Sequence, residues 1–109
     1  MFITKDSGKR KAFASGMVRD ISEDKTLWHL VTYGSMLRRW AELLTRGAKK
    51  YTANNWMKAN SEEEYNRFRE SAFRHFMQWY SGDIDEDHAS AVFFNINGAE
   101  YVKEKLTRM

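Results

Sequence analysis

The chain has 109 residues, of which 42% are hydrophobic and 15% aromatic, and its formal net charge is +3. This length and composition fit one folded domain and exclude a largely disordered chain. The sequence has no cysteine and no apolar run of the roughly 18 residues that cross a bilayer, which excludes a disulfide framework and predicts no membrane association. No secretory signal pattern opens the sequence, so we expect an intracellular protein.

A basic N-terminal arm is predicted over residues 1–21, followed by a single helical domain over residues 22–109. The first twenty residues hold five basic side chains against two acids: Lys5, Lys9, Arg10, Lys11 and Arg19 against Asp6 and Asp20. This segment has no sustained hydrophobic period and contains glycine and serine, so we expect only short extended pieces in it. Such an arm either acts as a solubilising terminus or binds nucleic acid through residues 1–19.

The first helix is predicted over residues 23–46. Ser22 fits the N-cap position, Glu23 and Asp24 suit the first turn, and Arg46–Gly47 is typical of a helix end. Apolar residues recur at helical spacing on two sides of it, one carrying Leu27, Leu30, Gly34, Leu37, Ala41 and Leu44, the other Met36, Trp40 and Leu43. One partner surface cannot cover two stripes, so we expect this helix to be central in the bundle or shared with another subunit.

A loop is predicted next, over residues 47–60, and it is long for a helix connection. Its side chains suit a nucleotide: lysines meet phosphate, asparagines read polar edges and aromatic rings stack on bases, with Lys49, Lys50, Asn54, Asn55, Tyr51 and Trp56 as the candidates. The alternative is two solvated lysines, an asparagine turn and two aromatic residues in the core. The sequence leaves both interpretations open.

The second helix is predicted over residues 62–80, because Ser61 and Glu64 form a capping-box pattern at its start. Its apolar face consists of Tyr65, Phe68, Ala72, Phe76 and Trp79, with His75 on the flank. The third helix is predicted over residues 86–106, with Asp85 as its N-cap. His88 and Asn95 are seven residues apart and therefore share one side of that helix.

The turn between these two helices concentrates the chemistry of the chain. Antiparallel helices joined by so few residues must lie side by side, so His75 and His88 are expected to border one cleft. Four acids lie between them: Asp83, Asp85, Glu86 and Asp87. Histidine and carboxylates together can hold a divalent ion and deprotonate water. The alternative is a polar turn in which the last three acids only stabilise the start of the third helix, and Asp83 is the acid that this alternative does not explain.

The motifs GAKKYTANNW at 47–56, RHFMQWYSGD at 74–83 and DEDHASAVFFNI at 85–96 occur in an order and spacing that resemble a known family. They are similar to the phage and bacterial dATP/dGTP diphosphohydrolase-type domains, which are allied to the MazG-like all-α nucleoside triphosphate pyrophosphohydrolases. The resemblance covers about residues 16–105. It implies hydrolysis of a purine deoxynucleoside triphosphate to the monophosphate and pyrophosphate, in the cytoplasm, or in the host cytoplasm if a phage encodes the chain.

The resemblance also implies a divalent ion, Mg²⁺ with Mn²⁺ as the alternative, and assigns roles to residues. The expected catalytic residues are His75, Asp83, Asp87 and His88, and the expected metal ligands are His75, Asp83, Glu86, Asp87 and His88. The expected nucleotide-binding residues are Lys49, Lys50, Tyr51, Asn55, Trp56, Arg74 and Asn95. One departure stands out: the EExxE and ExxD carboxylate cage of MazG-like enzymes is missing, and imidazole ligands favour Mn²⁺ or Zn²⁺ over Mg²⁺.

The predicted fold class is all-α: a bundle of about three main helices behind a basic arm, completed by oligomerisation as a homodimer or a higher homo-oligomer. The leading functional hypothesis is a metal-dependent pyrophosphohydrolase. Two alternatives remain open on the sequence. One is a non-enzymatic phage accessory protein that binds nucleic acid or nucleotide, and the other is a purely structural helical dimer.

Overall fold

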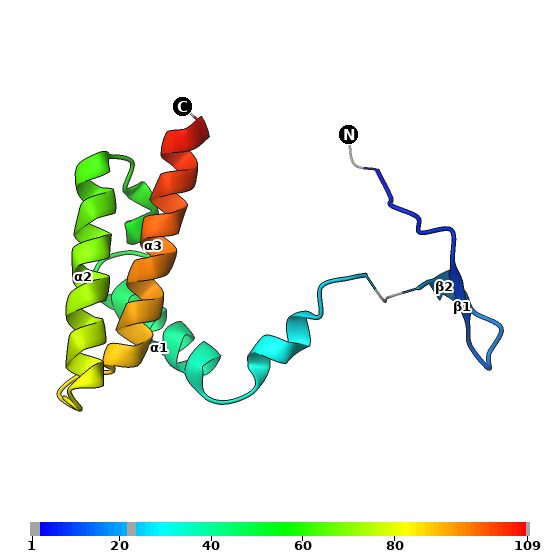
Figure 1. The fold of residues 1–109 in the computed structure, drawn as a ribbon, viewed down its shortest axis with the longest axis horizontal. Helices are drawn as coiled ribbons and strands as arrows, with labels where there is room; N and C mark the ends of the chain where they lie inside the picture. The colour runs from blue at the N-terminus through cyan, green and yellow to red at the C-terminus, as the bar shows by residue number, and fades with distance from the viewer. Residues whose placement is uncertain (1–2, 22–23, 109) are drawn as a thin grey trace. The chain divides into compact units, whose positions relative to one another are not determined.

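The computed structural model describes residues 3–21 and 24–108, and the chain divides into two compact units, Met1–Val31 and Thr32–Met109. The first unit holds an antiparallel pair of short strands, β1 (Arg10–Ala12) and β2 (Val18–Asp20), and the 3-10 helix η1 (Trp28–Thr32) ends at the division. The second unit contains α1 (Met36–Lys50), the 3-10 helix η2 (Asn55–Lys58), α2 (Glu62–Tyr80) and α3 (His88–Arg108) (Figure 1). The predicted all-α class with three main helices is confirmed.

The predicted first helix is wrong at both ends. Helix α1 begins only at Met36, because Gly34 adopts a left-handed backbone with φ of 81° and Ser35 takes the N-cap position. Leu27 and Leu30, from the apolar stripe predicted upstream of Gly34, are 51% and 55% exposed. The proposed cap Ser22 and Glu23 lie outside the described residues. At the other end the helix runs through Gly47 to Lys50, which removes the first four residues from the predicted loop.

Helix α2 spans the predicted residues, Glu62–Tyr80, and its capping box is confirmed. The Glu64 backbone N–H donates to Ser61 Oγ over 3.2 Å. In return the Glu64 carboxylate accepts from the Ser61 hydroxyl at 2.7 Å and from the Asn60 backbone N–H at 3.0 Å. These bonds satisfy donors that a helix start otherwise leaves open. At the far end Gly82, with φ of 85°, allows the chain to turn towards α3.

Helix α3 begins at His88, two residues later than predicted, and Asp85 is not its N-cap. Asp87 takes that role, since its carboxylate accepts from the Ser90 backbone N–H at 3.2 Å. The last three acids of the turn all fit an N-cap by composition. The choice between them depends on a tertiary contact of Asp87 with α1, described below.

The core of the helical unit lies along α3, which packs against α2, α1 and η2. The buried residues are Ala59 before α2 and, on α3, His88, Ser90, Ala91, Asn95, Gly98, Ala99 and Val102. Helix α1 has no buried residue and contacts α3 through an edge-to-face pair, Trp40 on Phe93 with ring centroids 6.3 Å apart. The central helix is therefore α3, and of the two arrangements expected for α1 the central one is wrong.

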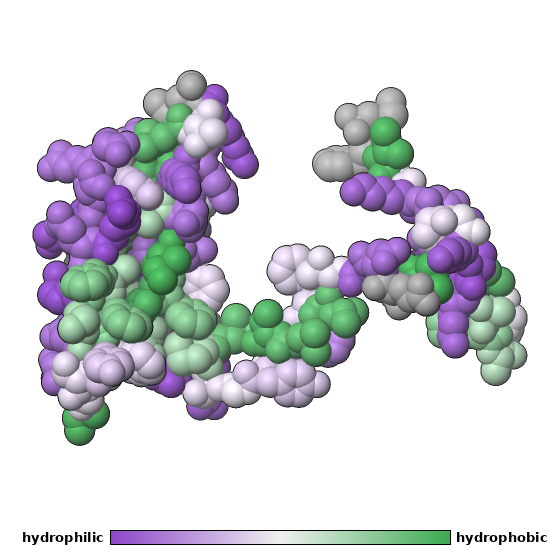
Figure 2. Space-filling view, viewed as in Figure 1, coloured by the Kyte–Doolittle hydropathy of each residue, from purple (hydrophilic) through white to green (hydrophobic). Residues whose placement is uncertain are grey.

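Large apolar side chains remain on the surface of the helical unit, where Figure 2 shows hydrophobic residues gathered near the turn between α2 and α3. They include Leu37, Phe73, Phe76, Met77, Trp79, Tyr80, Ile84, Phe93 and Ile96. Across residues 3–21 and 24–108, none of the helices combines the length and apolar character that a bilayer crossing requires.

Candidate active site

A cavity of about 630 Å³ opens in the helical unit between α1, α2 and the start of α3. Its lining residues are Leu43, Arg46, Gly47, Lys50, Ser71, Arg74, His75, Asp85, Glu86, Asp87, Ala91, Phe94 and Asn95. We refer to it as the charged cavity, because Arg46, Lys50 and Arg74 come from the helices and three acids come from the turn. Its volume is within the range of about 300–1,000 Å³ that is typical of small-molecule sites.

The two histidines that the sequence placed on neighbouring helices are in direct contact. His75 Nδ1 and His88 Nδ1 are 2.9 Å apart, and the two ring centroids are 5.1 Å apart. The other ring nitrogen of His88, Nε2, lies 2.7 Å from Asp85 Oδ1. The expected closeness of the histidines is thus confirmed. Asp85, expected as a helix cap and as one of the four acids of the turn, is the third member of a chain that runs from His75 through His88 to the turn.

The hydrogen bonds of this chain determine which ring nitrogens carry protons when both rings are neutral. Asp85 is an acceptor, so His88 donates from Nε2 and keeps its lone pair on Nδ1. His75 must then donate from its own Nδ1 to His88, which leaves the lone pair of His75 on Nε2. His75, which lines the charged cavity, thereby has a fixed tautomer and can accept a proton at Nε2.

The electrostatics of the chain support this protonation state. Burial lowers the pKa of His75 below its ordinary value, and the neighbouring Arg74 charge lowers it further. His75 is therefore neutral at pH 7. The hydrogen bond from His88 lowers the pKa of Asp85, which keeps that carboxyl ionised as an acceptor.

Asp87 is held by an arginine that sequence reasoning missed. Arg39 on α1 donates from Nε and Nη2 to the two carboxylate oxygens of Asp87, over 2.8 and 2.5 Å. The hydrogen bond with Arg39 is the main reason that the pKa of Asp87 lies far below its ordinary value. Arg39 and Asp87 are 48 residues apart in the sequence, so no local sequence pattern predicts their contact. Asp87 therefore joins α1 to the start of α3 at the rim of the charged cavity.

Replacing Asp87 with asparagine is expected to lower the free energy of unfolding by about 1–2 kcal/mol at pH 7, because two charge-assisted bonds at a partly exposed site are lost while asparagine still caps α3. The folded-state pKa of Asp87 is depressed, so its contribution is present above its ordinary pKa of 3.8 and is lost as the pH falls below that value. Thermal unfolding at pH 7 and at strongly acid pH checks both parts. An equal gap between wild type and variant at both pH values would contradict the assignment.

Three of the described residues could hold a metal ion together: Asp83, Asp85 and His88 each offer a ligand atom, and these atoms lie within 4.8 Å of one another. Asp83 and His88 were among the expected ligands, and Asp85 was not. Of the other expected ligands, His75 contacts His88 through its ring, Glu86 lines the charged cavity, and Asp87 is bonded to Arg39. The structure thus groups Asp83 and His88 with Asp85, and it places His75, Glu86 and Asp87 on the lining of the charged cavity.

Six of the seven expected nucleotide-binding residues line two neighbouring cavities. Lys50, Arg74 and Asn95 line the charged cavity, where the Asn95 amide donates to the Ala91 carbonyl oxygen at 2.8 Å. A second cavity of about 320 Å³, which we call the loop cavity, is lined by Leu43, Leu44, Gly47, Ala48, Tyr51, Thr52, Ala53, Asn54, Asn55, Trp56 and Phe94. Leu43, Gly47 and Phe94 line both, so the two cavities adjoin. Lys49 is exposed and lines neither.

Aromatic packing and hydrogen bonds hold the segment that lines the loop cavity against α3. Trp56 packs edge-to-face on Phe94 and Tyr101, with ring centroids 6.4 and 5.1 Å away. Lys105, which sequence reasoning did not single out, donates from Nζ to the carbonyl oxygens of Met57 and Ala59. Trp56 therefore serves the packing of the core, whereas Tyr51 and Asn55 are exposed in the loop cavity, as are the residues between them.

Comparison with models of protein families matches residues 15–103 to the family described as dATP/dGTP diphosphohydrolase, N-terminal. Searches of curated proteins and of solved structures find no match. The matched stretch includes every residue that lines the charged cavity and the loop cavity, and it covers most of the chain. The chain therefore belongs to the family of dATP/dGTP diphosphohydrolase N-terminal domains.

Proposed function

We propose that this domain hydrolyses dATP or dGTP to the deoxynucleoside monophosphate and pyrophosphate. The observation that carries the proposal is the charged cavity, which combines three cations with the chain of His75, His88 and Asp85. The description of the family supports the same reaction. A triphosphate needs cations along its oxygens, and its hydrolysis needs a group that takes a proton from water.

The two adjoining cavities suggest how the substrate lies. The phosphates bind in the charged cavity, where Arg46, Lys50 and Arg74 neutralise them. The base enters the loop cavity, which is mainly apolar and offers Tyr51 for stacking and Asn55 for hydrogen bonds. The sugar crosses the boundary that Leu43, Gly47 and Phe94 share. The Lys50 ammonium lies 5.2 Å from the centre of the Tyr51 ring, so one cation borders both parts of the site.

The residues of the turn fit the divalent ion that the reaction requires. Asp83 and Asp85 would hold it, since both are exposed carboxylates whose ligand atoms lie within 4.8 Å of one another. Both ring nitrogens of His88 are engaged with His75 and Asp85. When bound, a divalent ion neutralises phosphate charge and acidifies water. The two carboxylates suit Mg²⁺ and also accept Mn²⁺.

His75 is proposed to accept the proton of the attacking water at Nε2. Its Nδ1–H donates to His88 Nδ1 over 2.9 Å, which fixes the ring, and burial keeps the ring neutral at pH 7. His88 and Asp85 are positioning residues for this ring, and Asp85 is also a candidate ligand. Arg74, beside His75 in the sequence, binds phosphate oxygens and so places the substrate next to His75, the general base.

The proposal is tested by incubating the protein with each of the four deoxynucleoside triphosphates, in Mg²⁺ and separately in Mn²⁺, and measuring pyrophosphate and monophosphate. We expect release of both products in equal amounts, faster for the purine nucleotides. A variant that combines His75→Ala with Asp87→Ala serves as the background. Turnover no faster than this background for every nucleotide and metal would refute the proposal, and orthophosphate as the product would point to a different reaction.

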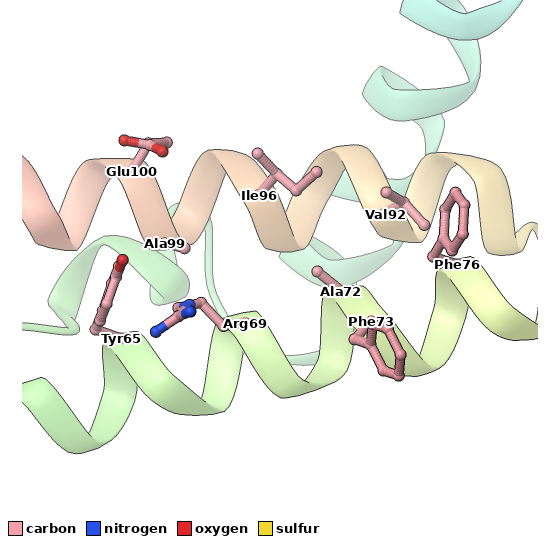
Figure 3. A pocket seen from close by; sticks show the side chains of 9 residues that line it. All are labelled: Tyr65, Arg69, Ala72, Phe73, Phe76, Val92, Ile96, Ala99 and Glu100. Atoms are coloured by element: carbon pink, nitrogen blue, oxygen red, sulfur yellow. The ribbon is translucent and has the colours of Figure 1, made fainter.

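We further propose that the bundle is completed by a second copy of the chain. An apolar groove of about 330 Å³ runs between α2 and α3, lined by Tyr65, Arg69, Ala72, Phe73, Phe76, Val92, Ile96, Ala99 and Glu100 (Figure 3). Phe73 and Ile96 remain 68% and 50% exposed on its sides. Exposed apolar residues gathered in this way mark an interaction surface.

The expected result is the mass of a dimer or a higher oligomer in light scattering at micromolar concentration. Phe73→Glu is expected to shift the protein towards the monomer, because a charge would be buried at the groove. Glu63→Gln changes an exposed side chain in the first turn of the same helix and serves as the control. A wild-type protein that is monomeric throughout this range would contradict the proposal.

A further inference from the structure

The hairpin of the N-terminal unit has a defined register that separates its side chains onto two faces. Arg10 pairs with Asp20, Lys11 with Arg19 and Ala12 with Val18. Backbone bonds continue the same register at both ends, from Phe13 N–H to the Met17 carbonyl at 2.9 Å and from Ile21 N–H to the Lys9 carbonyl at 3.3 Å. Side chains alternate along a strand, and directly paired residues share a face.

One face of the hairpin carries the acid of the ladder, Asp20, and its cation Arg10 also binds Asp6. The Arg10 guanidinium donates to both carboxylate oxygens of Asp6, over 2.7 and 2.8 Å, and holds the pKa of Asp6 at about 2. Asp20 accepts from the Ser7 hydroxyl and backbone N–H and lies 3.4 Å from Arg10. This face is close to neutral, and its charges are engaged with one another.

The opposite face carries cations without an acid among the ladder residues. Lys9, Lys11 and Phe13 lie along the first strand and its extensions, with Met17 and Arg19 opposite. The Lys11 ammonium lies 5.8 Å from the centre of the Phe13 ring, as expected for neighbours on one face. Lys11 and Arg19 are directly opposed, and like charges in this position destabilise a strand pair. We refer to this surface as the basic face. An anion bridging Lys11 and Arg19 would remove their repulsion.

We propose that the basic face of the hairpin binds single-stranded nucleic acid, with Lys9, Lys11 and Arg19 on the phosphates and Phe13 stacked on a base. A two-stranded ribbon with cations and an aromatic ring on one side matches what an unpaired strand offers, since each nucleotide presents a phosphate and an open base face. Phe13 is 42% exposed, which leaves room for a base. A duplex would conceal its base faces from this ring.

The structure favours nucleic acid over an anionic membrane as the partner. Membrane binding of this kind depends on a broad apolar surface that enters the lipid boundary. The basic face has only Phe13 and Met17 as exposed apolar side chains, and both lie at the turn end of the hairpin. Residues 9–13 precede the stretch matched to the family, whereas Met17 and Arg19 of this face lie within it.

The test uses the full chain and a short fluorescent oligothymidylate, with affinity measured by anisotropy at several salt concentrations. Three phosphate contacts predict that log K falls against log salt with a slope of about −2. Lys11→Glu is the decisive variant, because it reverses a charge on the basic face and also converts the repulsive pair with Arg19 into an attractive one, so the hairpin is retained. We expect it to reduce affinity at low salt by at least about tenfold. We also expect the salt dependence to become shallower, with a slope between about −1 and zero.

Phe13→Leu is expected to weaken binding by at least about fivefold without changing the slope, since it removes stacking and no charge. Lys103→Glu, on the exposed surface of α3, changes the net charge by the same amount as Lys11→Glu and is expected to leave affinity nearly unchanged. Equal losses in Lys11→Glu and Lys103→Glu, equal affinity for a duplex of the same length, or binding to phosphatidylserine vesicles but not to the oligonucleotide would each overturn the proposal. Hydrolysis of dATP by Lys11→Glu is expected to match wild type, so the outcome is independent of the proposed activity.

Discussion

Replacing His75 with glutamine is expected to lower the rate of dATP or dGTP hydrolysis by about 10²–10⁴-fold, the range that a positioned general base contributes. Glutamine can still donate a hydrogen bond to His88 Nδ1, so the neighbouring ring keeps a partner. It cannot take up a proton at neutral pH, and the lone pair that the chain of hydrogen bonds fixes on His75 Nε2 is lost. The loss should appear in kcat and leave KM nearly unchanged, because phosphate binding falls to Arg46, Lys50 and Arg74.

His29→Gln is the matched control, since it makes the same change at the third histidine of the chain, which lies in η1 and lines neither cavity. We expect it to retain the wild-type rate. Circular dichroism and the melting temperature of both variants check that the helices persist. A His75→Gln protein with the wild-type kcat would show that another group, or bulk water, takes the proton.

The pairing of His75 with His88 was predictable because each step depends on a local signal. The capping box at Ser61 and Glu64 fixed the start of α2, and Gly82 allowed the turn after it. A short connection then forces two helices to lie side by side. Helical spacing placed both histidines on flanks of apolar faces, and the structure brings their Nδ1 atoms to 2.9 Å. Because His75 and His88 are close in the sequence, local signals were enough to predict that they are close in space.

The contacts that the sequence did not reveal join residues far apart along the chain. Arg39 with Asp87, and Lys105 with Met57, are each separated by 48 residues. Such contacts depend on how α1 and η2 are rotated and placed against α3, which no window of the sequence encodes. The choice of Asp87 over Asp85 as the cap of α3 has the same origin. Any acid near that position could cap the helix, and Arg39 selects the one it can reach.

The misplaced start of α1 shows the limit of periodicity as a signal. Leu27, Leu30 and Gly34 recur at helical spacing, and this spacing predicted a helix that continues from them into Leu37. Spacing alone does not provide a surface to pack against, and Leu27 and Leu30 are more than half exposed. The left-handed backbone at Gly34 then separates η1 from α1. A helix is stabilised chiefly by burial of its apolar face. Helical spacing of apolar residues therefore predicts a helix only where another surface covers them.

Gly98→Ala is expected to lower the free energy of unfolding by about 1–2 kcal/mol, although alanine is the better helix former. A Cβ at Gly98 would lie 2.6 Å from Cε1 of Phe68, and two further atoms of that ring would be within 2.8 Å. Overpacking of this kind costs about 1–3 kcal/mol, which exceeds the gain of up to about 1 kcal/mol from helix propensity. The Phe68 ring cannot simply move away, since it packs edge-to-face on Phe94 at 6.1 Å.

Gly47→Ala is the matched control, because Gly47 also lies inside a helix and a Cβ there would meet nothing within 4 Å. Only propensity then acts, and we expect this variant to be stabilised by about 0.5–1 kcal/mol. In chemical denaturation, the free energies of unfolding of the two variants should therefore differ by about 1.5–3 kcal/mol for the same change of residue. Phe68→Leu provides the last step, since a smaller side chain opposite residue 98 should make Gly98→Ala less destabilising in that background than in wild type. If the penalty is the same in both backgrounds, the close approach of α2 and α3 at Phe68 is not its cause.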